Sequence, residues 1–155
     1  MCQLGFGLPY AIALQRLHPG RPVVNITGDG AFGFTLQELD TARRLRLPVV
    51  SVIHNNAAWG IIRAGQRGQL GFEMGPSLDG TDYAAIARGF GCHGETVERP
   101  EQVAPALRRA LDSGLPAVRD CRTRCEPHPG GPAFGRMNRY GFDGLTGLVP
   151  AVPPK

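Results

Sequence analysis

The stretch from Gly28 to Trp59 reads GDGAFGFTLQELDTARRLRLPVVSVIHNNAAW, and it decides the fold. An apolar, β-branched run at residues 23–27 leads into it, and a second such run fills residues 49–53. Runs of this kind are typical of buried parallel strands, and the pattern of residues 35–46 between them predicts a helix. The carboxyl ends of parallel strands lie at one edge of a sheet, where ligands bind. We therefore expect the residues that follow the two strands to lie close together.

The residues at that edge are suited to a metal diphosphate. Gly28-Asp29-Gly30 allows a sharp turn and a close approach of the backbone to a ligand. The helix that follows, roughly Thr35 to Arg46, would present N–H groups and the positive end of its dipole to an anion. Asp29 adds a carboxylate, a preferred ligand of Mg²⁺, and Asn55-Asn56 brings amide oxygens from the second strand. Together these groups predict a Mg²⁺–diphosphate site.

Other interpretations of the two motifs are weaker. Asp-Gly is a common turn pair and Asn-Asn a common loop pair, so either motif alone would indicate only a turn. Their joint placement, each after an apolar strand and separated by one helix, favours the cofactor site. A nicotinamide dinucleotide site is disfavoured because no G-x-G-x-x-G follows the run at 23–27 and no acidic residue closes the next strand. A Walker A site is excluded because the sequence has no G-K-[ST].

These residues resemble the cofactor fingerprint of enzymes that depend on thiamine diphosphate (ThDP). The fingerprint is Gly28-Asp29-Gly30 followed, about a helix and a strand later, by Asn55-Asn56. Residues 32–39 and 4–9 resemble in particular the acetolactate synthase and benzoylformate decarboxylase branch of that family. The likeness extends from about Leu4 to about Cys121. It makes the chain similar to the C-terminal, diphosphate-binding (PP) domain of these enzymes.

The resemblance implies which residues hold the cofactor. Asp29, the side chain of Asn56 and the backbone carbonyl of Ala58 would bind Mg²⁺. Ala58 departs from the glycine often found there, which matters little if only its carbonyl is used. Gly30, Ala31 and Ile61 would lie against the diphosphate. The full set of expected cofactor-binding residues is Gly28, Asp29, Gly30, Ala31, Asn56, Ala58 and Ile61.

The resemblance also implies a reaction. In the family the thiazolium carbon of ThDP, as an ylid, attacks a 2-keto acid, CO₂ leaves, and the product is protonated or captured by an acceptor, as in a lyase or a transferase. Mg²⁺ would serve as an anchor. The glutamate that activates the aminopyrimidine ring comes from a separate pyrimidine-binding domain, which a chain of 155 residues does not contain. Glu38 is the obvious internal carboxylate, but its place in the helix is typical of a structural residue.

The chain would then be a fragment of a longer enzyme or one half of a split one. It is expected to be inactive alone and to be completed by a pyrimidine-binding domain or subunit in a homo- or hetero-oligomer. Donor and acceptor substrates stay open, as does the choice between decarboxylase and carboligase. The alternative is a non-catalytic, cofactor-binding or interaction module that retains the fold. The presence of Asp29 and Asn56 favours the catalytic assembly.

Alternating helix and strand patterns predict an α/β protein with a mainly parallel sheet in three layers, α/β/α, without the first strand of the family's domain. Residues 1–124 would form the cofactor-binding domain, and the Pro- and Gly-rich residues 125–155 an extended arm. The Gly-rich residues 65–80 predict a loop over the cofactor. Asp82 is a candidate N-cap. One expected helix ends at Leu17, and the others cover 35–46, 83–90 and 100–111. The expected strands cover 23–27, 49–53, 94–97 and 115–121.

Composition argues against several other functions. Hydrophobic residues make up 42% of the chain and charged residues 19%, as in ordinary globular proteins. The formal charge of +4 comes from scattered arginines without interleaved aromatics, which argues against nucleic-acid binding. No apolar run reaches membrane-spanning length, and residues 4–17 lack the features of a signal peptide. We expect a cytoplasmic protein with no membrane or nucleic-acid partner.

The cysteines and histidines give weak signals. The 4 cysteines show no disulfide pattern, and Cys121-x3-Cys125-x2-His128 lacks the second ligand pair that a zinc site needs. His18, His93 and His128 are typical of surface or hydrogen-bonded histidines. His54 directly precedes Asn55-Asn56, but the alternation of side chains along a strand can point it away from the cofactor.

Overall fold

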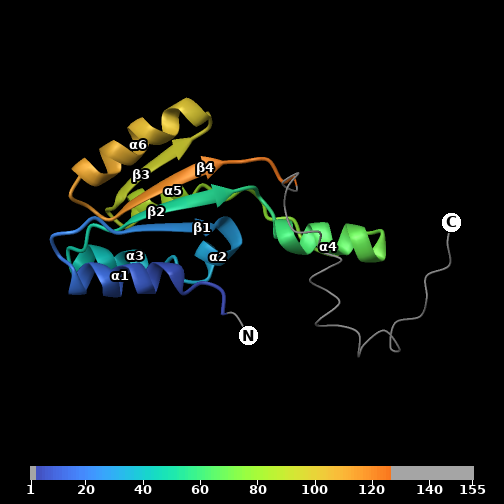
Figure 1. The fold of residues 1–155 in the computed structure, drawn as a ribbon, viewed down its shortest axis with the longest axis horizontal. Coiled ribbons are helices and arrows are strands. Elements are labelled where there is room, and N and C mark those ends of the chain that lie inside the picture. The colour runs from blue at the N-terminus through green and yellow to red at the C-terminus, as the bar shows by residue number, and fades with distance from the viewer. Residues whose placement is uncertain (1–2, 127–155) are drawn as a thin grey trace. The chain divides into compact units, whose positions relative to one another are not determined.

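The computed structural model describes residues 3–126 and contains the predicted alternation of helices and strands (Figure 1). Nearly all of the expected elements are present, with ends that differ by a few residues. In chain order the elements are α1 (Gly7–Leu17), β1 (Val24–Gly28), α2 (Asp29–Gly33), α3 (Glu38–Arg44), β2 (Val50–Asn55), α4 (Gly60–Leu70), α5 (Tyr83–Gly89), β3 (His93–Val97), α6 (Pro100–Asp112) and β4 (Ala117–Arg122).

The four strands form one parallel sheet in the order β1-β2-β4-β3. In its register, Gly28 at the end of β1 lies beside His54 of β2, and Asn55 lies beside Arg122 of β4. The turn after β1 and the segment after β2 therefore leave the sheet at the same edge, as the sequence predicts.

Helices cover both faces of this sheet, which confirms the three-layer α/β/α architecture (Figure 1). On one face α1, α3 and α5 pack on a core that includes Leu8, Leu39, Ile53 and Val118. On the other face α6 packs through Ala106 and Ala110 on the side chains of β2, β3 and β4. The apolar side chains of the central strands β2 and β4 are thus largely buried between the helix layers, whereas Val24 and Ile26 of the edge strand β1 are exposed.

The expected helix at residues 35–46 differs from the structure. Helix α2 begins directly at Asp29, residues 34–37 form a turn, and α3 runs from Glu38 to Arg44. The hydroxyl of Thr35 donates to the carbonyl of Gly5, so this side chain is engaged outside the helix. The backbone bonds here link residues three apart, from the Glu38 N–H to the Thr35 carbonyl and from the Leu39 N–H to the Leu36 carbonyl, as in a tight turn and not an α-helix. The N-terminus expected at Thr35 is therefore not formed there.

Contacts divide the chain into two compact units, which we describe separately. Within the described residues, the sheet unit comprises residues 3–57 and 78–124, and the α4 unit comprises residues 58–77 and 125–126. Within the α4 unit, residues 60–70 are helical, so the loop expected at 65–80 is wrong over its first part. Side-chain pairs with the segment that follows α4, including Arg67 with Glu73 and Gln66 with Met74, offset the helix cost of the glycines.

Other local predictions hold. The Asp82 carboxylate accepts a hydrogen bond from the Ala85 N–H at 2.8 Å, so Asp82 is the N-cap of α5. Gly94 lets α5 approach β3, because a Cβ there would overlap the Ala84 carbonyl.

Among the described residues, no helix has the length and apolar character needed to cross a membrane. The predicted arm at 125–155, with Phe134, Tyr140 and Phe142, lies outside the described residues apart from Cys125 and Glu126, and the 1–124 boundary stays a prediction.

Candidate functional site

The Gly-Asp-Gly motif forms the turn between β1 and α2. Gly28 is the last residue of β1, and Asp29 is the first residue of α2. Asp29 is 4% exposed, and its Oδ1 accepts a hydrogen bond from the Gly30 N–H at 2.9 Å. Its Oδ2 is buried and has no hydrogen-bond partner. A buried polar atom without a partner is costly, and such atoms are characteristic of sites that bind a ligand.

The oxygen chemistry at Asp29 fits a hard cation such as Mg²⁺. Within residues 3–126 no group of three or more His, Cys, Asp or Glu side chains could hold a metal ion. A metal at Asp29 would therefore need amide or main-chain oxygens as its other protein ligands. This is the donor set that Asn56 and Ala58 were expected to supply.

Asn55 has a different role from the one expected of the Asn-Asn pair. Its side chain is buried, and its Nδ2 donates to Asp120 Oδ1 at 2.9 Å and to the Thr81 carbonyl at 3.0 Å. Its Oδ1 accepts from the Ala57 N–H at 3.2 Å. All of its polar atoms are engaged within the protein, so it is not available as a ligand. Asn56 is half-buried and follows directly, at the edge where Gly28 and Asp29 also lie.

The remaining predicted residues separate into two groups. Gly30 and Ala31 lie in α2, beside Asp29. Ala58 and Ile61 belong to the α4 unit, where Ala58 is buried and bridges Ser77, and Ile61 is 67% exposed at the start of α4. The structure thus groups Gly28, Asp29, Gly30, Ala31 and Asn56 in the sheet unit, and the roles of Ala58 and Ile61 stay predictions.

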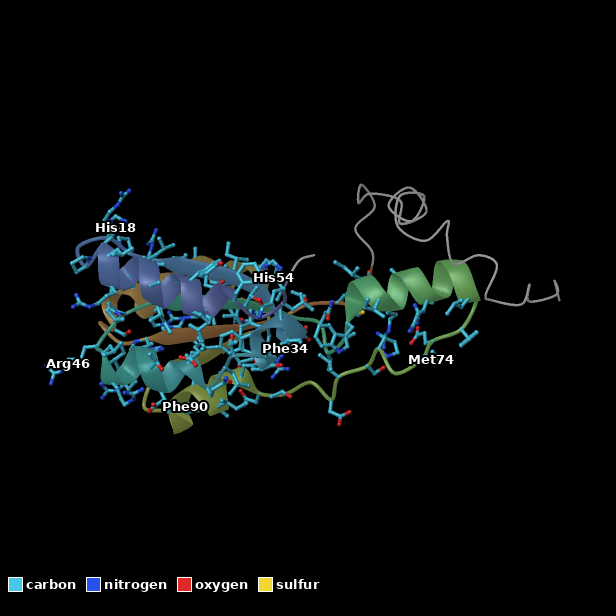
Figure 2. All side chains as sticks on the ribbon, turned by 90° about the horizontal axis from the view of Figure 1, so that it is seen from below. His18, Phe34, Arg46, His54, Met74 and Phe90 are labelled. Carbon is cyan, nitrogen blue, oxygen red and sulfur yellow. The ribbon has the colours of Figure 1, made fainter. Side chains whose placement is uncertain are left out.

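The other candidates of the sequence fall outside this constellation. His54 is exposed, whereas its neighbour Asn55 is buried, in agreement with opposite orientations along the strand (Figure 2). Glu38 is the first residue of α3, and its structural role stays a prediction. Cys92 and Cys121 are buried, and burial raises the pKa of both thiols.

Sequence reasoning missed two buried residues next to Asp29 and Asn55. Asp120 in β4 is fully buried, accepts hydrogen bonds from Asn55 Nδ2 and from the Tyr83 N–H at 3.1 Å, and forms an ion pair with Arg122 Nη2 at 3.0 Å. Burial raises its pKa, while the bond from Asn55 and the charge of Arg122 oppose that shift. A signal was present, because a charged pair interrupts the apolar run of β4.

Tyr83, the first residue of α5, completes this group. Its hydroxyl donates to the main-chain carbonyl of Asp29 at 3.0 Å. Its ring meets the ring of Phe32 edge-on, with centroids 5.6 Å apart. Burial and then the negative charge of Asp29 raise the pKa of the phenol, so the Tyr83 hydroxyl stays protonated and can donate this hydrogen bond at neutral pH.

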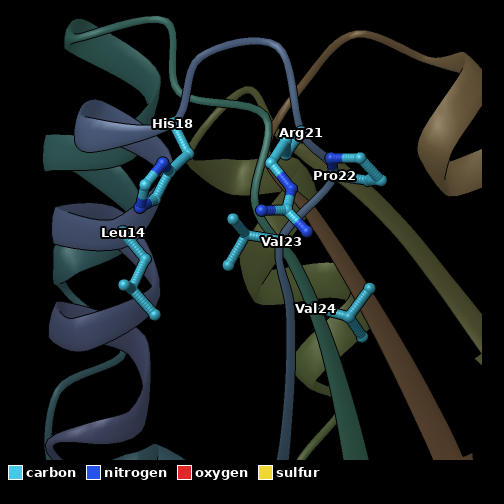
Figure 3. Close-up of a pocket in the computed structure, with 6 residues that line it drawn as sticks. All are labelled: Leu14, His18, Arg21, Pro22, Val23 and Val24. Carbon is cyan, nitrogen blue, oxygen red and sulfur yellow. The ribbon is translucent and has the colours of Figure 1, made fainter.

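A separate hollow lies at the opposite end of β1 (Figure 3). It lies between the end of α1 and the start of β1, far along the strand from Asp29. Its lining combines aliphatic side chains with a histidine and an arginine: Leu14, His18, Arg21, Pro22, Val23 and Val24. It contains none of the predicted site residues.

Comparisons with known proteins agree with this arrangement. The family model "Thiamine pyrophosphate enzyme, C-terminal TPP binding domain" matches residues 1–121. A probable acetolactate synthase of Mycobacterium bovis is 46% identical over 116 residues, or 74% of this chain and 21% of that protein. A sulfoacetaldehyde acetyltransferase of Castellaniella defragrans is 35% identical over 115 residues, or 72% of this chain and 19% of that protein.

A solved structure gives the same result. The thiamine diphosphate-dependent 4-hydroxybenzoylformate decarboxylase of Rhodococcus jostii matches with a TM-score of 0.73 and 33% identity, over 78% of this chain and 23% of that one. The chain thus spans about a fifth of the length of the curated relatives it matches. The family match includes the Gly-Asp-Gly turn and the Asn55-Asn56 segment. The chain therefore belongs to the thiamine pyrophosphate enzyme family, and residues 1–121 are its C-terminal TPP-binding domain.

Proposed function

We propose that this chain binds ThDP through Mg²⁺ as the C-terminal part of an acetolactate synthase-like enzyme acting on 2-keto acids. The observation that carries the proposal is the buried Asp29 Oδ2, which has no partner within the protein. An atom of this kind costs stability unless a ligand uses it. The same observation argues against an interaction module that no longer binds the cofactor, whereas a non-catalytic module that still binds it remains the alternative.

In this proposal each residue has a defined task. Asp29 and the side chain of Asn56 bind Mg²⁺ together with the Ala58 carbonyl, and Gly28, Gly30, Ala31 and Ile61 adjoin the diphosphate. The two glycines leave room for a close approach of the phosphate oxygens to the backbone. Mg²⁺ neutralises the diphosphate and fixes its orientation.

The bound cofactor would supply the nucleophilic carbon and the electron sink for cleavage next to the keto group. The residues assigned here act only at its diphosphate end. Binding of that end is the same in the ground and transition states, so it lowers no barrier by itself. We therefore assign the activation of the aminopyrimidine ring to a pyrimidine-binding domain or subunit that completes the active site.

The reaction type is the less defined part of the proposal. The relatives that match this chain include proteins named as a synthase, an acetyltransferase and a decarboxylase. The domain is thus shared among enzymes with different acceptors. We assign this chain to carboligation or decarboxylation of a 2-keto acid, with an acceptor chosen by residues outside it.

The test is calorimetric titration of the chain with ThDP in the presence and absence of Mg²⁺. Binding should require Mg²⁺, and Asp29→Ala should abolish it, because a carboxylate is the strongest of the proposed ligands. Asp40→Ala is the matched control, since Asp40 is an exposed aspartate that pairs with Arg44 on α3. Equal affinity in the wild type and in Asp29→Ala would refute the assignment of Asp29.

A further inference from the structure

Asp120 joins three segments that leave the sheet near the cofactor edge. It is fully buried in β4, where it lies beside Ile53 of β2 in the register. Its Oδ1 accepts from Asn55, its Oδ2 accepts from the Tyr83 N–H, and Arg122 Nη2 forms an ion pair with Oδ2. An ionised carboxylate can accept all of these bonds, because it needs no hydrogen of its own.

The bond to Asp120 sets the orientation of the Asn55 amide. With its Nδ2 directed at Asp120 and at the Thr81 carbonyl, its Oδ1 is left to accept from the Ala57 N–H. This bond closes a turn around Asn56, and Ala57 takes a left-handed conformation with φ of 54°. Asparagine side chains commonly hold turns by this contact. Asp120 therefore acts on the backbone that carries Asn56.

Tyr83 carries the same connection to the other half of the site. Its N–H binds Asp120, and its hydroxyl binds the carbonyl of Asp29. Its ring also packs against Phe32 of α2. With the main chain held by Tyr83 and Oδ1 held by Gly30, the carboxylate of Asp29 has one orientation, in which Oδ2 is unpaired.

From these contacts we propose that Asp120 is a positioning residue, which acts through Tyr83 and Asn55 to hold Asp29 and Asn56 in one arrangement for a Mg²⁺ diphosphate. The inference rests on the proposed function. Mg²⁺ demands nearly ideal octahedral geometry, whereas Ca²⁺ tolerates a range of geometries. A looser arrangement of the same ligands should therefore weaken binding with Mg²⁺ more than binding with Ca²⁺.

Tyr83→Phe tests the link to Asp29. It removes the hydroxyl and keeps the ring that packs on Phe32. ThDP affinity is measured by calorimetry, once with Mg²⁺ and once with Ca²⁺. We expect the affinity for ThDP to fall about tenfold with Mg²⁺, which is the scale of one hydrogen bond, and less than about threefold with Ca²⁺. Tyr10→Phe is the matched control, because Tyr10 of α1 is 63% exposed and its ring contacts Phe6, the residue before that helix; it should change neither affinity.

Asp120→Asn tests the centre of the group. The variant keeps the shape of the side chain but replaces one acceptor oxygen by a donor. The ratio of Mg²⁺- to Ca²⁺-supported affinity should fall as it does in Tyr83→Phe. Urea unfolding is followed in parallel, since a purely structural role would lower stability and both affinities together and leave the ratio unchanged. If Asp120→Asn does not fold, an unchanged ratio in Tyr83→Phe still refutes the inference.

The outcomes separate the inference from the proposed function. A wild-type chain that binds ThDP equally with and without a divalent cation, or not at all, would refute the proposed function and the inference with it. The inference alone would be refuted if the wild-type chain binds ThDP with Mg²⁺ and the ratio of Mg²⁺- to Ca²⁺-supported affinity is the same in Tyr83→Phe as in Tyr10→Phe.

Discussion

Two buried charges of the sheet unit, Asp29 and Arg119, differ in how the protein satisfies them. Asp29 lies at the carboxyl edge of the sheet and has a buried oxygen without a partner. Arg119, in β4, is 1% exposed and uses all three of its nitrogens. Nε donates to the Ala106 carbonyl at 2.8 Å, Nη1 to the Val118 carbonyl at 2.9 Å, and Nη2 contacts His93 Nδ1 at 2.8 Å.

The difference separates a structural charge from a binding charge. Glu95 lies 3.9 Å from Arg119 and is itself paired with Arg109, so the positive charge of Arg119 is also balanced from β3. Burial of a charge is acceptable when hydrogen bonds and an opposite charge compensate it. At Arg119 this compensation is internal. At Asp29 it is incomplete, and the missing part is what a cation would provide.

The largest effect is expected at Arg119. Arg119→Met should lower the free energy of unfolding by about 3 kcal/mol, because it leaves the partners of a buried charge without their donor. Urea unfolding of the cofactor-free chain measures the change. Arg44→Met is the control, since Arg44 forms an exposed ion pair with Asp40 and should change stability by less than about 0.5 kcal/mol. Equal effects of the two variants would remove the contrast between the two regions.

The second effect should have the opposite sign. Without Mg²⁺ and ThDP, Asp29→Ala should leave the free energy of unfolding unchanged or raise it by about 1 kcal/mol. The variant loses the bond from Gly30, but it also removes the unpaired oxygen. Thermal and urea unfolding of the apo protein check this sign. A loss of about 2 kcal/mol or more would mean that Asp29 is as structural as Arg119.

The smallest effect concerns pH. Arg119 can only donate, so His93 Nδ1 must accept and the ring must be neutral. Burial and then the charge of Arg119 lower the pKa of His93 below its usual value of 6.5. The unfolded chain therefore binds the proton more readily, and stability is lost as the pH falls below about 6.5.

The size of this pH effect should be about 0.5 kcal/mol between pH 7.5 and 5.5, the low end for one hydrogen bond. His93→Gln removes the titrating group, so the difference between the variant and the wild type isolates it from Asp120 and other carboxylates. Urea unfolding across this pH range gives both curves. If the free energy of unfolding depends on pH in the same way in His93→Gln and in the wild type, His93 does not contribute to holding Arg119.

Much of the fold follows from local patterns in the sequence. Apolar, β-branched runs predicted β1 and β2, and the alternation of helix and strand patterns placed β3 and β4. Asp82 predicted the start of α5 through its N-cap. Helix α4 was missed because Gly65 and Gly68 lower its intrinsic propensity, and its stabilising contacts come from a segment that follows it.

The candidate site shows a similar division. Asp29 and the Asn-Asn pair were recognisable as motifs, and parallel strands place them at the same edge. Which of the two asparagines is committed to the protein could not be predicted, because Asn55 is engaged by Asp120 and Thr81, both distant in sequence. The link from Tyr83 to Asp29 is of the same kind.

The sequence by itself determined the four strands, the parallel α/β class and the family-typical motifs, because each of these is set by neighbouring residues and their hydrophobic period. Only the tertiary structure decided which buried polar atoms have partners. It paired Arg119 and Asp120 completely and left one oxygen of Asp29 unpaired. Satisfaction of a buried charge depends on groups brought together from distant parts of the chain, and no local pattern encodes that geometry.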